Sequence, residues 1–319
     1  MTDLLYSSTK SLAQAIRTKQ LSSTELTRAY LDRITAVNPQ LNAVVQLAAD
    51  AAFTQARAAD DALAQGTLWG PLHGVPFTIK DSFDTADIIS TWGTLGRANF
   101  IPDQDATVVT RLKAAGAILM GKTNTPEFTL SFETDNPVYG RTLNPYDQTR
   151  MPGGSSGGAA AILAAGGAAF DIGSDTGGSS RIPAAFSGVC GLKPPSGRVP
   201  RTGHCPPPGG PIDQMTTIGP LARHVEDLEL LLPLIIGPDG RDPYIHPVPL
   251  RKPAEVTIRN LRVALYTNNG LYPAEPAVVQ AVTHAAQQLA DLGAQVEEKR
   301  PPLADQARET PTPPIRHRR

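Results

Sequence analysis

The sequence predicts an α/β fold in which a β-sheet core is covered by helices. From Gly70 onward, short apolar segments of strand length alternate with segments of helical period. The segment 261–298 has the same order, with a strand, a helix and a second strand. The chain shows neither an internal repeat nor a heptad pattern, so a repeat protein or a coiled coil is not expected.

The first 66 residues are predicted to form helices that pack on and support this core. Ser22 and Glu25 have the spacing of a capping box before a periodic run, which marks the start of a helix. The segment 48–65 is rich in alanine and stops at Gly66, a residue that commonly follows a helix. We therefore expect an N-terminal helical segment over residues 1–66.

Residues 67–300 hold the predicted catalytic core. Its expected strands and helices are, in order, strand 75–80, helix 105–115, strand 117–120, strand 168–173, strand 261–266, helix 273–292 and strand 294–298. After Ala304 the chain is polar, has no apolar period and ends in a basic cluster. Residues 301–319 are therefore expected to be a disordered, solvated tail.

The charge balance excludes a protein built to attract nucleic acid or an anionic membrane. Twenty-nine Lys and Arg residues face 30 Asp and Glu residues, which leaves a formal charge of −1. The N-terminus lacks an apolar core of signal-peptide length, and the apolar stretch 228–236 is short and contains Glu229 and Pro233. We expect a soluble, cytoplasmic protein that acts on a small uncharged molecule, and a homodimer is compatible with the sequence.

The two cysteines indicate neither a disulfide nor a metal site. Cys190 and Cys205 have no companions at metal-ligand spacing, and the cytosol keeps such thiols reduced. They are interpreted as small buried apolar residues. No cofactor and no metal is expected.

Two glycine-flanked serine clusters stand out between Met151 and Arg181. Their first serines, Ser155 and Ser179, are 24 residues apart. A flexible Gly/Ser linker is the alternative interpretation. However, the intervening segment AAAILAAGGAAFDIG is apolar enough for a buried helix and a buried strand, which would hold both clusters at the ends of core elements.

The second cluster has the composition of an oxyanion-binding loop. Glycine permits close approach of the backbone, so the run Thr176-Gly177-Gly178-Ser179 can turn several N–H groups toward one point. Donors fixed in this way stabilise the charge of a tetrahedral intermediate by about 3 to 4 kcal/mol each. The hydroxyl group of Ser179 is therefore the candidate nucleophile.

Serine needs a base, and Lys80 is a better candidate than any histidine. None of the six histidines lies in a glycine-serine motif. Lys80 ends the strand-like run GVPFTIKD, which could carry its amine into the interior. Burial there would lower the lysine pKa far below its usual value of about 10.4. A lysine reaching solvent from the strand end is the alternative, and Asp81 is interpreted as a turn or capping residue.

Three segments taken in order resemble the amidase signature family: GVPFTIKD, NPVYGRTLNPYDQTRMPGGSSGG and GSDTGGSSRIPAAFSGVCGLKP. The resemblance runs from about residue 21 to about residue 298. It implies a mixed sheet flanked by helices and a triad in which Ser179 is the nucleophile, Ser155 shuttles protons and Lys80 is the base. It also implies that the Gly154-Ser155 peptide bond is cis.

Further roles follow from the same resemblance. The N–H groups of Thr176, Gly177 and Gly178 would form the oxyanion hole, and Asp175 and Arg181 would tie down that loop by hydrogen bonds. For the last two, a purely structural ion pair is the alternative. The stretch TGHCPPPGGPIDQM is more similar to stand-alone amidases than to the amidotransferase members of the family, and it could border the acyl pocket.

Two features depart from the family pattern. Ser180 replaces the apolar residue common after the nucleophile, which leaves the catalytic groups untouched. Family members usually continue well beyond the unit that ends near Glu298, so the C-terminal part of the family fold is expected to be missing here. That absence puts folding stability and substrate specificity in question more than the triad.

The predicted function is hydrolysis of a carboxylic acid amide to a carboxylate and ammonia or an amine. The alternatives are a truncated, catalytically impaired amidase-like protein and a protein similar to the A subunit of glutamyl-tRNA amidotransferase. Two further alternatives rest on the glycines. Residues 153–157 fit the G-x-S-x-G elbow of an α/β-hydrolase, but a polar, proline-containing segment precedes them. A phosphate-binding loop would need a lysine directly after a glycine cluster.

Overall fold

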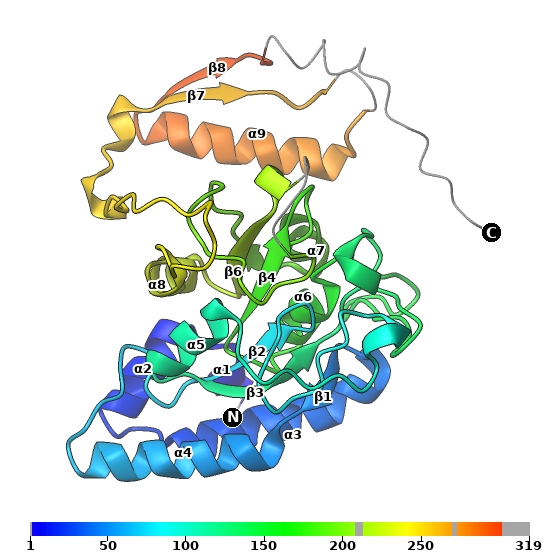
Figure 1. Ribbon diagram of the computed structural model, residues 1–319. Helices are drawn as coiled ribbons and strands as arrows, with labels where there is room; N and C mark the ends of the chain where they lie inside the picture. The colour runs from blue at the N-terminus through cyan, green and yellow to red at the C-terminus, as the bar shows by residue number, and fades with distance from the viewer. Residues whose placement is uncertain (1, 208–212, 270–272, 302–319) are drawn as a thin grey trace. The chain divides into compact units, whose positions relative to one another are not determined.

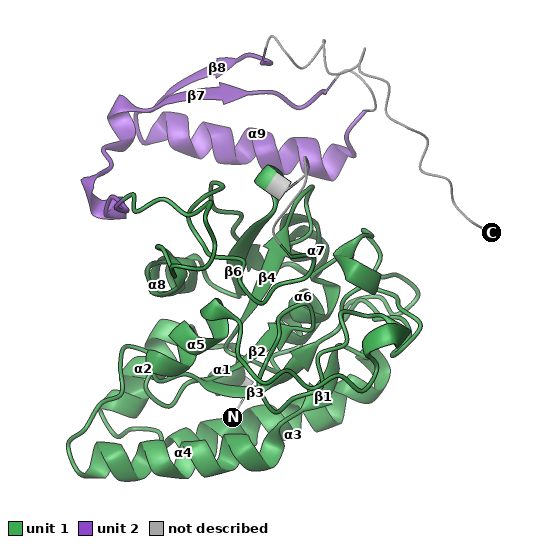
Figure 2. Ribbon diagram, viewed as in Figure 1, with its two compact units in different colours: residues 1–248 green, residues 249–319 purple. Residues whose placement is uncertain are grey.

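The computed structural model describes residues 2–207, 213–269 and 273–301. The chain divides into two compact units, Met1–Val248 and Pro249–Arg319 (Figure 2). Residues 302–319, which hold nearly all of the expected disordered tail, lie outside the described residues.

Unit 1 is built on a six-stranded mixed sheet with the order β1-β3-β2-β4-β6-β5 (Figure 1). Strand β2 is parallel to β3 and β4, whereas the pairs β1–β3, β4–β6 and β5–β6 are antiparallel. The expectation of a mixed sheet is therefore confirmed. The strands are β1 (Val44–Leu47), β2 (Pro76–Lys80), β3 (Ile118–Thr123), β4 (Phe170–Asp175), β5 (Cys190–Gly191) and β6 (Thr217–Ala222).

Helices cover this sheet. Helix α6 packs against β2, β4 and β6, α4 packs against β3, and α8 packs against β6. The helices of unit 1 are α1 (Thr2–Tyr6), α2 (Thr9–Arg17), α3 (Ser23–Leu41), α4 (Ala49–Ala64), α5 (Thr107–Ala114), α6 (Gly157–Ala164), α7 (Arg181–Ser187) and α8 (Val225–Ile235). Short 3-10 helices are η1 (Leu95–Arg97), η2 (Glu127–Thr129) and η3 (Asp213–Met215).

Two N-terminal helix boundaries lie where the sequence predicts them, but the segment 1–66 is not wholly helical, because strand β1 interrupts it and joins the sheet beside β3. Ser22 and Glu25 form the predicted capping box at the start of α3, because each side chain bonds the backbone N–H of the other residue. Helix α4 ends at Ala64, and Gly66 follows with a φ of +81°. Figure 1 shows α3 and α4 side by side, and they are in direct contact.

The register of the central strands fixes which side chains share a face of the sheet. Thr78 of β2 lies opposite Asp171 of β4, and Lys80 lies opposite Thr123 of β3. Since side chains alternate along a strand, Thr78 and Lys80 point to the same face. All residues of β2, β3 and β4 are buried, so any charged group on them sits in the interior.

Unit 2 contains the predicted strand, helix, strand unit. Its two strands pair in parallel as a separate two-stranded sheet, with α9 packed against both. Its elements are η4 (Pro253–Glu255), η5 (Ile258–Asn260), β7 (Arg262–Leu265), α9 (Pro276–Asp291) and β8 (Gln295–Glu298). Within the described residues, no helix of either unit has the length and apolar character needed to cross a bilayer.

Candidate active site

Lys80 is fully buried at the end of β2 and contacts a serine of the first cluster. Its Nζ lies 2.6 Å from Ser155 Oγ and 3.0 Å from Ser174 Oγ. Burial lowers the lysine pKa to about 7, although the carboxyl groups of Asp175 and Asp171 act to raise it. An amine of this kind is uncharged in a substantial fraction of molecules near neutral pH.

The two serine clusters lie next to each other. The backbone N–H of Ser156 donates to the carbonyl of Ser179 at 3.0 Å, which joins the first cluster to the second. The Gly154-Ser155 peptide bond is cis, as the resemblance implies. Helix α6 begins at Gly157, directly after the first cluster, and α7 begins at Arg181, directly after the second.

Asp175 organises the loop that carries Ser179. Its carboxylate accepts hydrogen bonds from the backbone N–H groups of Gly178 and Ser180, and it forms a two-point ion pair with Arg181 at 2.9 and 3.0 Å. Burial acts to raise the Asp175 pKa, but the hydrogen bonds from Arg181, Ser180 and Gly178 hold it below the usual value. Asp175 and Arg181 thus tie the turn together.

The expected oxyanion donors of this loop differ in whether their N–H groups are already hydrogen-bonded within the protein. The N–H of Gly178 already donates to Asp175. The hydroxyl of Thr176 shares a hydrogen bond of 2.8 Å with the hydroxyl of Thr216, which anchors the loop to the segment before β6. Among the described residues, the N–H of Gly177 has no hydrogen-bond acceptor. Gly177 is therefore better placed than Gly178 to serve a substrate.

Ser179 is 6% exposed, and its hydroxyl makes no hydrogen bond to any described residue. Apolar side chains lie beside the two glycines that precede Ser179. A side chain at Gly177 would meet the half-exposed ring of Phe132 at 3.6 Å, and one at Gly178 would meet Ile182. This lining suits an uncharged group better than a charged one.

Two of the described histidines bond backbone groups away from the serine clusters, and a third, His204, whose pKa burial lowers, lies near enough to Lys80 for the lysine to lower that pKa further. His73 is buried and bonds the backbone of Trp69 and Ala59, and His224 bonds the carbonyl of Tyr6. His204 is buried against Phe83, with no hydrogen-bond partner in the described chain for either ring nitrogen. No described histidine is hydrogen-bonded to a serine of the two clusters.

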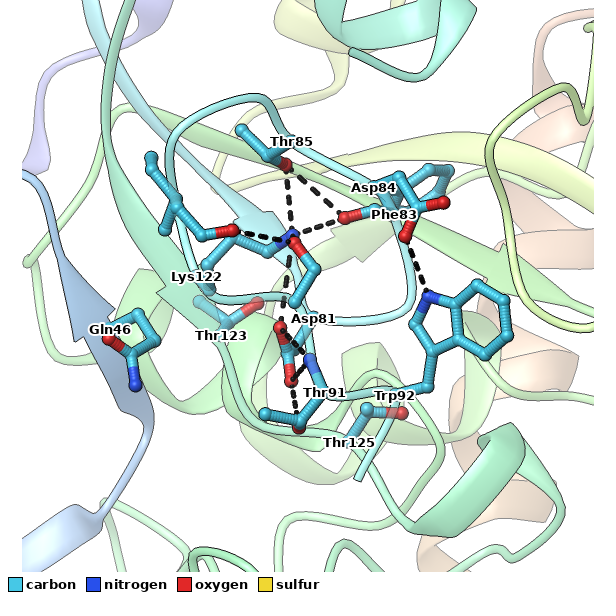
Figure 3. Close-up of polar contacts among 12 residues, drawn as sticks. Gln46, Asp81, Phe83, Asp84, Thr85, Thr91, Trp92, Lys122, Thr123 and Thr125 are labelled. Atoms are coloured by element: carbon cyan, nitrogen blue, oxygen red, sulfur yellow. Dashed lines mark hydrogen bonds and ion pairs between the residues drawn. The ribbon is translucent and has the colours of Figure 1, made fainter. Parts of the chain in front are cut away.

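Sequence reasoning missed a second buried lysine, Lys122 of β3 (Figure 3). Its ammonium group donates to the carbonyl of Phe83 and to the hydroxyls of Thr85 and Ser90, and it lies 3.8 Å from the Asp81 carboxylate. Asp81 is therefore the buried partner of an ion pair and not merely a turn or capping residue. Burial lowers the Lys122 pKa to about 8.

Asp171 of β4 was also missed. It is fully buried, and its Oδ2 accepts hydrogen bonds from Thr78 at 2.7 Å and Thr123 at 3.1 Å. Burial raises its pKa to about 7. The signal that could have located Asp171 and Lys122 is the same: each is a charged residue inside a run of apolar strand residues.

Neither cysteine takes part in a metal site within the described ranges. Cys190 and Cys205 are both free thiols, and Cys205 is buried as expected while Cys190 is half-buried. In the residues that the structure describes, no three His, Cys, Asp or Glu side chains lie close enough to share an ion.

Comparison with known proteins gives a consistent assignment. The family model described as Amidase matches residues 25–311. The A subunit of glutamyl-tRNA(Gln) amidotransferase from Chloroflexus aurantiacus is 43% identical over 299 residues, covering 92% of this chain and 60% of that protein. The protein of the same name from Mycobacteroides abscessus is 40% identical over 307 residues, covering 93% and 61%. The chain thus spans about 60% of the length of these curated relatives.

Solved structures with the same fold include amide hydrolases. Fatty acid amide hydrolase superposes with a TM-score of 0.88 at 31% identity, covering 96% of this chain and 55% of the other. Native peptide amidase from Stenotrophomonas maltophilia has a TM-score of 0.85 at 35% identity, covering 95% and 64%. For 6-aminohexanoate cyclic dimer hydrolase in complex with its substrate, the TM-score is 0.81 at 32% identity, covering 93% and 61%.

Proposed function

Because this chain belongs to the amidase signature family, we propose that it hydrolyses carboxylic acid amides, with Ser179 as nucleophile, Ser155 as proton shuttle and Lys80 as base. The observation that carries the proposal is the 2.6 Å separation between Lys80 Nζ and Ser155 Oγ in a fully buried setting. A serine hydroxyl is an effective nucleophile only when a base takes its proton. A buried amine with a pKa of about 7 is such a base.

The reaction would begin with uncharged Lys80. It takes a proton from Ser155, which takes one from Ser179 as the Ser179 oxygen attacks the amide carbon. The N–H of Gly177 is proposed to stabilise the resulting oxyanion, together with other backbone N–H groups of the loop. The proton then returns through Ser155 to the leaving nitrogen, the C–N bond breaks, and ammonia or an amine departs from the acyl-enzyme.

The second half repeats the relay with water. Water gives a proton through Ser155 to Lys80 and attacks the acyl carbon, and the returning proton releases Ser179 and the carboxylic acid. One amide and one water give one acid and one amine. Neither half requires a charged group on the substrate, which agrees with the apolar side chains of Phe132 and Ile182 beside Gly177 and Gly178.

Ammonia release tests the activity. Purified protein is incubated with an aliphatic and an aromatic primary amide, beside the variants Ser179→Ala and Ser180→Ala. Ser180 is a matched control, because it is the adjacent buried serine and its hydroxyl has no partner in the described chain. We expect Ser180→Ala to retain activity and Ser179→Ala to lose it. Equal release by the wild type and Ser179→Ala would leave only the catalytically impaired alternative.

A fluorophosphonate label mapped by mass spectrometry tests the nucleophile directly. We expect modification of Ser179 in the wild type and in Ser180→Ala, and none in Lys80→Ala. Alanine replacement of His204, His224, His246 and His284 in turn tests the histidine-based alternative. Loss of turnover in one of these folded variants alone would favour an α/β-hydrolase mechanism, for which the required strand before Ser155 is absent from the described chain.

A second candidate function is that of an amidotransferase component, which the names of the 40–43% identical relatives favour. The two candidates differ in the amide they take. Faster ammonia release from glutamine than from an apolar amide of similar size would support the amidotransferase role. The opposite preference would support a stand-alone amidase.

A further inference from the structure

A buried carboxyl group lies on the same face of the sheet as the proposed catalytic lysine. Asp171 is opposite Thr78 in the parallel pair β2–β4, and Thr78 and Lys80 share one face of β2. Thr123, which is opposite Lys80, also bonds Asp171. The carboxyl group and the amine therefore face one small interior region bounded by β2, β3 and β4.

The hydrogen bonds of Asp171 leave one oxygen unused. Both threonine hydroxyls donate to Oδ2, whereas Oδ1 is buried with no partner among the described residues. A buried, unpartnered carboxylate oxygen is costly, and protonation reduces that cost. No ion pair within 4.0 Å joins Asp171 to Lys80 in the described chain, so the two groups interact through space.

We propose that Asp171 is a positioning residue that acts through Lys80: its buried carboxyl group sets the pH at which the lysine loses its proton and becomes the base for Ser155. The inference rests on the proposed function of Lys80. A negative carboxylate stabilises the ammonium form of a nearby lysine in a low-dielectric interior, whereas a neutral carboxyl group does not. Near neutral pH the two sites therefore titrate as a coupled pair.

The other charged groups around Lys80 hold a constant charge in this pH range. Asp175 raises the lysine pKa most among its neighbours, but its own pKa is low and Arg181 balances its charge. Burial raises the pKa of the Cys205 thiol to about 12 and lowers that of His204 well below its usual value, so both stay neutral.

Two further elements pack near this pair. Helix α6, which packs on the same strands, carries no ionisable side chain. Lys122 of β3 responds to Asp171 as well, but its nearest carboxylate is Asp81. Burial raises the Asp171 pKa to about 7, the region in which Lys80 also titrates. Of the groups that act directly on Lys80, Asp171 is therefore the one whose charge changes while Lys80 is changing state.

The experiment compares the pH dependence of kcat/KM for the wild type and Asp171→Asn. Asparagine has nearly the same shape and can still accept from Thr78 and Thr123. Without the negative charge, the ammonium form of Lys80 is less stable, so the acidic limb should move to lower pH by about one pH unit. The plateau rate should fall, because a base of lower pKa is a weaker base.

Asp227→Asn is the matched control. Asp227 of α8 is also a fully buried carboxyl group, and its Oδ2 has no partner among the described residues. Its Oδ1 accepts the N–H of Lys10. Asp227 is not among the groups that act on the pKa of Lys80. Its replacement should leave the acidic limb in place. An unchanged limb in folded Asp171→Asn, or an equal shift in both variants, would overturn the proposal.

A second variant keeps the test decisive should Asp171→Asn fold poorly. Thr123→Val removes one hydrogen bond to Oδ2, which favours the protonated carboxyl group and should move the limb in the same direction by a smaller amount. A shift to higher pH would contradict the proposal. This variant leaves Lys80, Ser155 and Ser179 unaltered.

Carbon-13 NMR of aspartate-labelled protein separates failure of this inference from failure of the proposed function. Asp171 should give a carboxyl resonance that titrates near neutral pH and is missing from Asp171→Asn. Lysine Nζ resonances in the same samples should report a lower pKa for Lys80 in that variant. These spectra need no turnover, so an inactive protein that shows both effects would refute the amidase proposal alone. A Lys80 resonance unaffected by Asp171→Asn would refute the coupling.

Discussion

The two buried lysines of the main sheet, Lys80 and Lys122, have different hydrogen-bond partners. This difference suits Lys80 to act as a base and Lys122 to act as a structural cation. Lys122 gives its N–H groups to a carbonyl and two hydroxyls and has the Asp81 carboxylate 3.8 Å away. Lys80 has only two serine hydroxyls as hydrogen-bond partners and no ion pair in the described chain. Protein groups thus stabilise the ammonium form more strongly at Lys122 than at Lys80.

The first prediction concerns pH. Because the Lys80 pKa is lowered to about 7, the uncharged base is scarce in acid, and kcat/KM should rise about tenfold per pH unit below that value and level off above it. Steady-state rates between pH 5 and 9 in buffers of constant ionic strength provide the measurement. Lys80→Ala should reduce kcat about 100- to 10,000-fold. A rate that is flat from acid to alkali would contradict a titrating lysine.

The second prediction concerns stability. Lys122→Met leaves the buried carboxylate of Asp81 without its cation, which should lower the free energy of unfolding by about 3 to 5 kcal/mol. Urea unfolding provides the measurement, with the exposed Lys19→Met as control. Adding Asp81→Asn to Lys122→Met should restore part of the loss, because the uncompensated charge is then gone. A single-variant cost as small as that of Lys19→Met would rule out a structural ion pair.

At the scale of elements, the strands that could be predicted are those with continuous apolar runs. Strands β2, β3 and β4 lie within two or three residues of their expected bounds, since all three are buried on both faces. Strand β6 was missed because it contains Gly219 and Pro220, which argue against a strand. Pro220 donates no N–H to the sheet, but its carbonyl accepts the N–H of Leu192.

Some residues of the site could likewise be predicted from the sequence, and others could not. Lys80, Ser155 and Ser179 could be named because they occur in motifs, and the structure brings the lysine to the first cluster and the first cluster to the second. Asp171 and Lys122 have no motif, and their importance depends on which strands are neighbours. Strand order and register come from tertiary packing, which periodicity along the chain does not encode.

The third prediction tests the pairing of β1 with β3. A side chain at Gly121 would lie 2.1 Å from the carbonyl oxygen of Gln46, so Gly121→Ala must push the two strands apart. We expect a loss of roughly 1 to 3 kcal/mol in the free energy of unfolding. Gly96→Ala is the control, because its added methyl group meets nothing closer than 4.0 Å. Equal midpoints in urea for the two variants would contradict the close approach.

At the scale of the whole molecule, the two units differ in how much core they possess. Unit 1 holds every residue of the proposed triad and nearly all of the buried apolar side chains. In unit 2 the described buried residues are Ala286 and Ala294, and its sheet has two strands with exposed or half-exposed positions. A two-stranded sheet with so little burial has low intrinsic stability.

The last prediction follows from that difference. Backbone amides of β7, β8 and α9 should exchange with deuterium well before those of β4, because opening unit 2 exposes little apolar surface. Mass spectrometry of the full chain in increasing urea gives the order of opening, and fluorophosphonate labelling in the same samples reports the site. We expect labelling of Ser179 to persist at urea concentrations where unit 2 already exchanges freely, since Lys80, Ser155 and Ser179 all belong to unit 1. Exchange of both units at one urea concentration, with labelling lost at that same point, would mean that the site depends on unit 2 for its integrity.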